Sequence, residues 1–92
     1  MSKHTPGPWR TDLYDGTLVI DPDGVPVATT TGDYESADEY AVMEADALLI
    51  AAAPDLLEAL IDLAGAGAEA WGEDRPCVRI ARAAIAKAKG QP

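Results

Sequence analysis

The sequence predicts an α+β fold, in which a three-stranded antiparallel β-meander is followed by two to three packed α-helices. Turn signals at Asp15-Gly16 and Pro22-Asp-Gly24 separate short segments rich in β-branched residues. Beyond residue 36 the apolar residues recur at helical spacing instead. We expect the 92 residues to form a single domain, consisting of an extended arm (1–8), the meander (9–30) and a helical part (36–89).

The meander is expected to begin at Trp9, because Thr5-Pro-Gly-Pro8 favours an extended entry. Alternation from Trp9 to Tyr14 predicts the first strand, and Asp15-Gly16 predicts a two-residue turn into a second strand over 17–21. The third strand is expected over 25–30. Since Pro26 cannot donate a ladder hydrogen bond, this strand belongs at an edge of the sheet.

The first helix is predicted over 36–53, because Ser36 and Glu39 form a capping box. Its last two turns are apolar almost all the way round, which predicts cover on two sides, by the sheet and by a second helix or a second subunit. Helical spacing predicts which face of this helix points inward, and it places Met43 and Ile50 on the opposite side. The residues assigned to that inward face are Ala37, Ala41, Ala45, Leu48, Leu49 and Ala52.

Two further helices are predicted after Pro54, which suits a helix N-terminus. The first is expected to stop at Gly65-Ala-Gly67, with Trp71 in the following loop. The second is expected over 75–89, capped by Asp74 and ended by Gly90. The predicted inward residues are Leu56, Leu57, Leu60, Leu63 and Ala64 on one helix, and Cys77, Ala81, Ala84, Ile85 and Ala88 on the other.

The charges are distributed very unevenly along the chain, whose formal net charge is −9. Sixteen acids and no lysine or arginine lie between Thr11 and Asp74, whereas Arg75 to Lys89 holds five cations and no acid. One interpretation is that the basic last helix packs beside the acidic one, with Arg79 and Arg82 facing Glu58 and Asp62. The remaining acids have no predicted neighbours of opposite sign, and they form either a solubility device or a docking surface for a basic groove, such as a nucleic-acid-binding channel.

No motif predicts catalysis, a metal site or a cofactor, so none is expected. His4 is the single histidine, and Cys77 is the single cysteine, which we expect to be a buried small hydrophobe. Asp21-Pro-Asp-Gly24 lacks the further ligands of a calcium loop and is interpreted as a turn. The acidic balance argues against direct binding to nucleic acid or anionic lipid, and no apolar run is long enough to span a membrane. A cytoplasmic location is expected.

Two segments carry a resemblance to known proteins. The sequences His4-Thr-Pro-Gly-Pro-Trp9 and Glu44-Ala-Asp-Ala-Leu-Leu-Ile-Ala-Ala-Ala-Pro-Asp-Leu-Leu-Glu-Ala-Leu60 resemble a group of small proteins encoded by tailed bacteriophages and prophages. Members of that group usually have Asn where this chain has Asp46. The resemblance implies a phage setting and supplies no catalytic residues. Small phage proteins of this kind often act on host machinery, including immune systems.

These observations lead to a functional hypothesis, namely a non-enzymatic phage or prophage accessory protein that binds and inhibits a host protein or complex. Its most concrete version is a counter-defence, anti-CRISPR-like inhibitor that uses an acidic surface. The alternatives are an oligomeric sponge for a nucleotide signal, using Arg75, Arg79 and Arg82, and a structural or regulatory homodimer packed through Met43 and Ile50. The candidate partner-binding residues are Asp33, Glu35, Asp38, Glu39 and Trp71.

Overall fold

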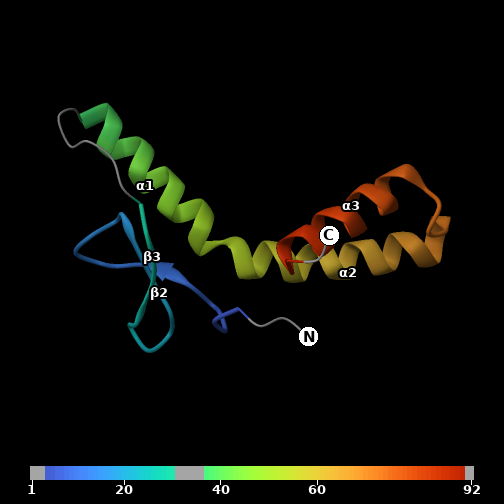
Figure 1. Cartoon of the computed structure of the whole chain (residues 1–92), viewed down its shortest axis with the longest axis horizontal. Helices are drawn as coiled ribbons and strands as arrows, with labels where there is room; N and C mark the ends of the chain where they lie inside the picture. The colour runs from blue at the N-terminus through green and yellow to red at the C-terminus, as the bar shows by residue number, and fades with distance from the viewer. Residues whose placement is uncertain (1–3, 31–36, 91–92) are drawn as a thin grey trace. The chain divides into compact units, whose positions relative to one another are not determined.

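The computed structural model describes residues 4–30 and 37–90, and its chain divides into two compact units. One unit, Thr5–Pro54, contains β1 (Arg10–Thr11), β2 (Leu18–Ile20), β3 (Pro26–Thr29) and α1 (Ala37–Ala51). The other, which runs from Asp55 onward, contains most of α2 (Ala53–Trp71) and all of α3 (Pro76–Ala88). Figure 1 shows these elements in order. The predicted α+β class, a three-stranded antiparallel sheet followed by helices, is confirmed.

The sheet has the order β1-β2-β3, so β3 with Pro26 is an edge strand as predicted. Arg10 pairs with Ile20 on one side of β2, and Val19 pairs with Ala28 on the other. The register shifts between Val19 and Ile20, and Ile20 then lies opposite Pro26. A bulge is expected at this point, because Pro26 has no N–H to donate to the ladder.

The connection between β1 and β2 is longer than the predicted two-residue turn at Asp15-Gly16. Asp12 donates its backbone N–H to the Leu18 carbonyl at 2.9 Å, which closes a loop over residues 12–17. The Asp12 carboxylate accepts the N–H groups of Tyr14 and Asp15, each at 3.1 Å. This aspartate turn ends the strand at Thr11, because its side chain competes with the ladder for backbone donors. Leu13 is consequently 86% exposed.

The core of the Thr5–Pro54 unit lies between β2 and α1. Val19 and Ala47 are fully buried, and Ala51 completes the cluster. Trp9 and Ile50 pack against it, and the Trp9 indole donates to the Thr5 carbonyl at 3.1 Å. Trp9 is therefore a half-buried residue at the margin of this core.

Two segments that are distant in sequence meet in this unit. A Cβ on Gly7 would lie 3.0 Å from the Pro54 Cβ, so the backbone of the entry arm packs directly against Pro54 at the start of α2. Trp9 packs at the same time on the cluster that contains Ala47 and Ala51. The segments that carry the phage resemblance are therefore in mutual contact and have a structural role.

The face of α1 that points inward differs from the prediction. The buried residues are Met43, Ala47 and Ala51, whereas Leu48 and Leu49 are 61% and 65% exposed. Apolar residues surround the second half of this helix, so their spacing could not select a face. The sheet selects the alanine face, because small side chains let α1 approach β2 closely. The predicted cap residue Ser36 lies outside the described residues.

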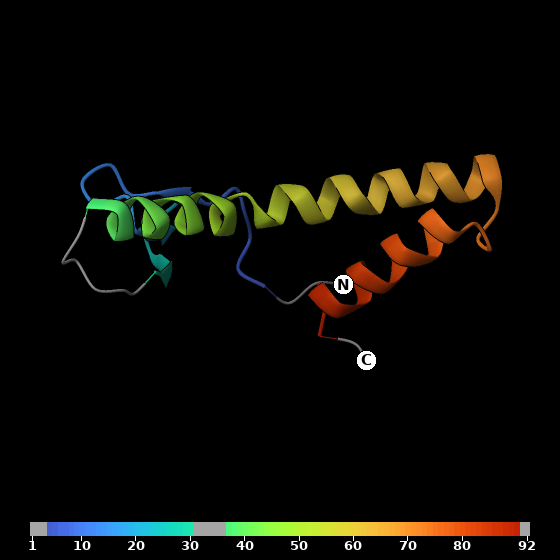
Figure 2. The same cartoon turned by 90° about the horizontal axis from the view of Figure 1, so that it is seen from above.

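α2 and α3 form a helical hairpin joined by residues 72–75 (Figure 2). The predicted helix end at Gly65-Ala-Gly67 is wrong, because α2 continues to Trp71 and ends at Gly72. Gly72 has a φ of +89° and donates to the Ala68 carbonyl at 2.8 Å, a conformation that glycine adopts at helix ends without strain. Gly65 and Gly67 weaken a helix without being obliged to end it.

The start and end of α3 have different origins. Arg75, rather than the predicted Asp74, occupies the N-cap position, and Pro76 begins the helix without needing an N–H partner. Gly90 ends the helix region as predicted, with a φ of +76° and a bond to the Lys87 carbonyl at 3.1 Å. Val78 and Ile85 are buried, whereas Cys77 is exposed, which corrects its predicted inward position.

The two helices approach one another at Gly67. A Cβ built on this glycine would lie 3.3 Å from the Val78 Cγ2 atom and 3.4 Å from the Trp71 ring. A Cβ on Gly65 would meet nothing within 4 Å. Gly67 therefore has a packing role, whereas Gly65 only lowers the helical propensity of α2.

We expect Gly65→Ala to raise the free energy of unfolding by about 0.5–1 kcal/mol, because alanine favours a helix interior over glycine. Gly67→Ala has the same propensity gain, but its Cβ displaces Val78 or Trp71, so this variant should be about 1 kcal/mol less stable than Gly65→Ala. Urea denaturation followed by circular dichroism measures both. Equal stabilisation by the two substitutions would contradict the close approach at Gly67.

Candidate functional site

The net charge of the chain is concentrated in one of its two units. Between Thr5 and Pro54 the sequence has ten acids and one arginine, whereas Asp55–Pro92 has six acids and five cations. The unit containing the sheet and α1 is therefore strongly acidic, and the helical hairpin is close to neutral. This division follows the structural boundary, which the sequence pattern alone did not place.

Four of the acids in the acidic unit have a structural role. Asp12, Asp15 and Asp21 accept hydrogen bonds within their own turns, and each of them helps to fix the path of a hairpin loop. The Asp21 carboxylate accepts the N–H groups of both Asp23 and Val25 at 2.9 Å, which confirms the predicted turn there. Glu44 lies over Gly16, where an added Cβ would come within 2.6 Å of its Oε2 atom.

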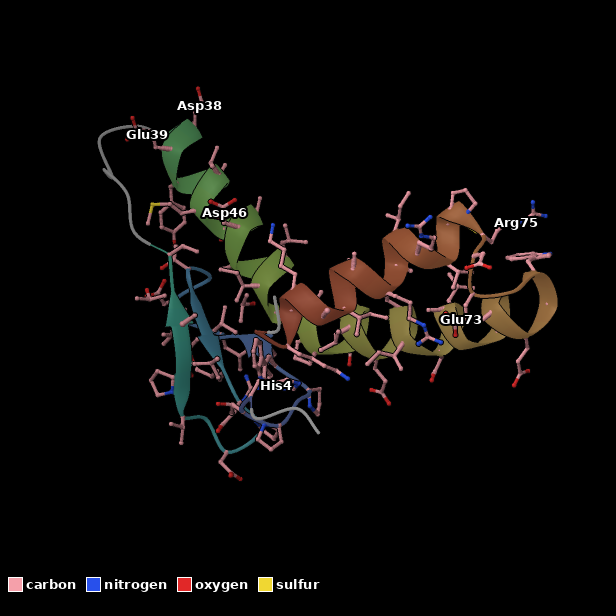
Figure 3. All side chains as sticks on the ribbon, turned by 45° about the vertical axis from the view of Figure 1, so that its right-hand side comes forward. His4, Asp38, Glu39, Asp46, Glu73 and Arg75 are labelled. Atoms are coloured by element: carbon pink, nitrogen blue, oxygen red, sulfur yellow. The ribbon has the colours of Figure 1, made fainter. Side chains whose placement is uncertain are left out.

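The exposed acids of α1 form a second group. Asp38 and Glu39 project from the first turn of the helix, and Asp46 lies two turns further along (Figure 3). Carboxylates in a first turn are favoured by the helix dipole. Asp46 is likewise exposed on α1. The other two acids proposed from sequence, Asp33 and Glu35, lie outside the described residues.

The Asp15 carboxyl has a lowered pKa, and its hydrogen bonds explain why. The Thr17 hydroxyl donates to its Oδ1 atom at 2.6 Å and the Thr17 N–H donates at 3.0 Å, and these bonds hold the pKa of the carboxyl below its ordinary value. Thr17 itself is 1% exposed. The bond therefore joins a buried hydroxyl to a carboxylate at the surface, and it fixes the loop next to Glu44.

The hairpin presents an apolar groove of about 560 Å³ on its inner side. No charged residue lines it. Leu63, Trp71 and Ile80 are 66%, 59% and 70% exposed. The full lining comprises Leu60, Leu63, Ala64, Gly67, Trp71, Cys77, Val78, Ile80, Ala81 and Ala84.

Trp71, the fifth residue proposed from sequence, is thus an exposed side chain at the end of α2, instead of lying in a loop as predicted. The groove itself was missed because the glycines were interpreted as a helix end. One signal was available: Leu60, Ala64, Gly67 and Trp71 follow the helical spacing of a single face straight through both glycines.

The arginines of α3 have different environments from those predicted. Arg82 pairs with Glu73, with Nη2 3.1 Å from Oε1, and this corrects the expected pairing with Glu58 or Asp62. Arg79 lines a shallow depression on α3 with Pro76, Ile80 and Ala83. Glu73 therefore competes with any anion for the Arg82 guanidinium.

Within residues 4–30 and 37–90, no group of three or more histidine, cysteine, aspartate or glutamate side chains is placed to hold a metal ion. In that same part of the chain, no helix combines the length and hydrophobicity needed to cross a bilayer. Every buried side-chain nitrogen or oxygen of these residues has a hydrogen-bond partner. The described residues therefore offer surfaces, and a groove, as their candidate sites.

These features define a small α+β protein with a strongly acidic unit and a near-neutral helical hairpin. The model of the family of Salmonella phage P22 protein Y8K6 matches residues 1–92, and the chain belongs to this family. The phage setting implied by the resemblance is thereby confirmed. Neither a curated protein nor a solved structure gives a significant match.

The bond between Thr17 and Asp15 makes a pH-dependent contribution to stability. Since the pKa of Asp15 is lowered in the folded state, this contribution is present above the unfolded value of about 3.9 and is lost as the pH falls through the folded pKa. We expect Thr17→Val to raise the pKa of Asp15 toward its ordinary value, because the hydroxyl donor is removed. Carboxyl NMR titration measures this change. The matched control is Thr29→Val, which changes an exposed threonine at the end of β3. An unchanged pKa in Thr17→Val would contradict the assigned cause.

Proposed function

We propose that this phage protein is a non-enzymatic accessory protein, which binds and inhibits a host protein or complex through the acidic surface of its Thr5–Pro54 unit. The observation that carries the proposal is the concentration of charge: ten acids and one arginine belong to a single compact unit. Such a surface is complementary to a basic groove and accelerates association with it.

The partner that best fits this surface is a nucleic-acid-binding component of a host defence system, which makes an anti-CRISPR-like inhibitor the most specific form of the proposal. Carboxylates spaced along α1, including Asp38, Glu39 and Asp46, can pair with the lysine and arginine side chains of a partner that otherwise bind phosphates. Asp33 and Glu35, which precede α1 in sequence, belong to the same proposed surface. The action takes place in the host cytoplasm under this proposal.

The nucleotide-sponge alternative is less well supported. It requires the arginines of α3 to converge on an anion, but Arg82 is already bound to Glu73 at 3.1 Å. The pairing is exposed, so it is weak and open to competition. Nucleotide that copurified with the protein and was lost in Arg79→Ala would favour the sponge over the inhibitor.

The test is affinity capture from host lysate with two variants of equal net charge. The triple variant Asp38→Asn/Glu39→Gln/Asp46→Asn neutralises α1, and the control Asp55→Asn/Glu58→Gln/Asp62→Asn removes the same charge from α2. We expect the wild type to capture a basic nucleic-acid-binding protein at about 50 mM salt and to release it at about 500 mM, because screening shortens the range of the attraction. The α1 variant should capture at least about fivefold less, and the control should retain capture.

Two further measurements sharpen the outcome. Added DNA should displace the partner if both occupy the same groove, and thermal unfolding should show that the α1 variant remains folded. Equal losses in the two variants would indicate non-specific polyanion behaviour and would contradict a specific acidic surface. Capture of the same partner at both salt concentrations would contradict an electrostatic interface.

A further inference from the structure

The helical hairpin has too little buried surface to account for its own order. Of the described residues from Asp55 onward, the buried ones are Ala64, Gly67, Val78 and Ile85, and two of these have no side chain beyond Cβ. An isolated helix of 13 residues is marginal in water, and in proteins the stability of helices comes mostly from packing an apolar face. The groove lined by Leu63, Trp71 and Ile80 is such a face, and its side chains are more than half exposed.

We propose that this groove is the self-association surface of the protein, and that its occupant is the same groove of a second copy. Two hairpins packed face to face form a four-helix arrangement in which each groove is filled by the other copy's apolar side chains. This inference does not depend on the proposed inhibitor function, since it concerns the other unit of the chain.

The size of the hairpin face approaches what a stable dimer requires. A helix of 19 residues is about 28 Å long and one of 13 residues is about 20 Å long at a rise of 1.5 Å per residue. Two such helices side by side present a face roughly 20 Å wide, and thus a footprint of roughly 500 Å². Since side chains make the accessible area larger than the footprint, this approaches the roughly 800 Å² per partner of a specific interface.

The charge distribution favours a second copy as the occupant. No charged residue lines the groove, so closing it on itself desolvates no carboxylate or amine. The sequence from Asp55 to Pro92 has six acids and five cations, so two hairpins do not repel each other strongly. Two Thr5–Pro54 units would repel, since each has ten acids and one arginine.

This assignment differs from a dimer packed through Met43 and Ile50. Met43 is only 4% exposed and packs within its own unit, so it is not available to a second subunit. Leu48 and Leu49 on α1 are also exposed, but they belong to the acidic unit. They therefore provide a matched control for the groove residues.

The first test is the mass of the full chain in solution, measured by analytical ultracentrifugation over a dilution series. We expect a dimer of twice 9.6 kDa that persists in about 1 M NaCl, where charges are screened beyond about 3 Å. Leu63→Gln and Ile80→Gln should each raise the dimer dissociation constant at least tenfold. Leu49→Gln, which changes a leucine of equal exposure, should leave it unchanged.

A second readout uses Cys77, the single cysteine of the sequence. It lines the groove and is exposed to solvent in the monomer. In the wild type, its rate of alkylation by a maleimide should fall severalfold as protein concentration rises, and in Leu63→Gln it should not. A wild type that is monomeric up to about 100 µM, with an alkylation rate independent of concentration, would overturn the proposal. Dissociation by Leu49→Gln instead of Leu63→Gln would also overturn it, by moving the interface to α1.

Discussion

The fold of the acidic unit depends on the contact between Val19 of β2 and the alanines of α1. Three strands of two to four residues cannot bury much surface by themselves, so one helix has to lie very close to the central strand. Ala47 and Ala51 permit that approach, and Trp9 covers the edge of the cluster. Thr30 adds a polar connection, because its hydroxyl donates to the Met43 carbonyl at 2.9 Å. The loops around this contact are then free to carry acids.

The elements that sequence could predict are those with unambiguous local chemistry. The turn at Asp21–Gly24, the edge position of Pro26 and the helix end at Gly90 all depend on backbone preferences of glycine, proline and aspartate, and all are present. The inward face of α1 could not be predicted, because apolar residues surround its second half. The choice between Leu48 and Ala47 is made by the shape of the sheet, which is a tertiary constraint.

The candidate sites were predictable only in part, for a similar reason. Asp38, Glu39 and Trp71 could be identified as exposed candidates from charge and position. The groove could not, because it needs α2 to pass through two glycines and then meet α3 at Gly67, a contact between residues 67 and 78. Helix propensity counts both glycines as breakers, whereas packing makes one of them necessary. Gly67, which the sequence pattern assigns to a helix end, is therefore the residue that allows α2 and α3 to approach each other.

The acidic surface and the apolar groove lie on separate units and respond differently to salt, so the two proposed associations would use different residues. Salt screens the carboxylates of α1 and weakens attraction to a basic partner. It leaves the uncharged groove intact and reduces repulsion between the acidic units of two copies. A dimer formed through the hairpins would also present two acidic units in one particle, which strengthens binding to a partner with two basic sites without any new contact. Self-association through the groove would thus increase the effect of the acidic surface while requiring none of its residues.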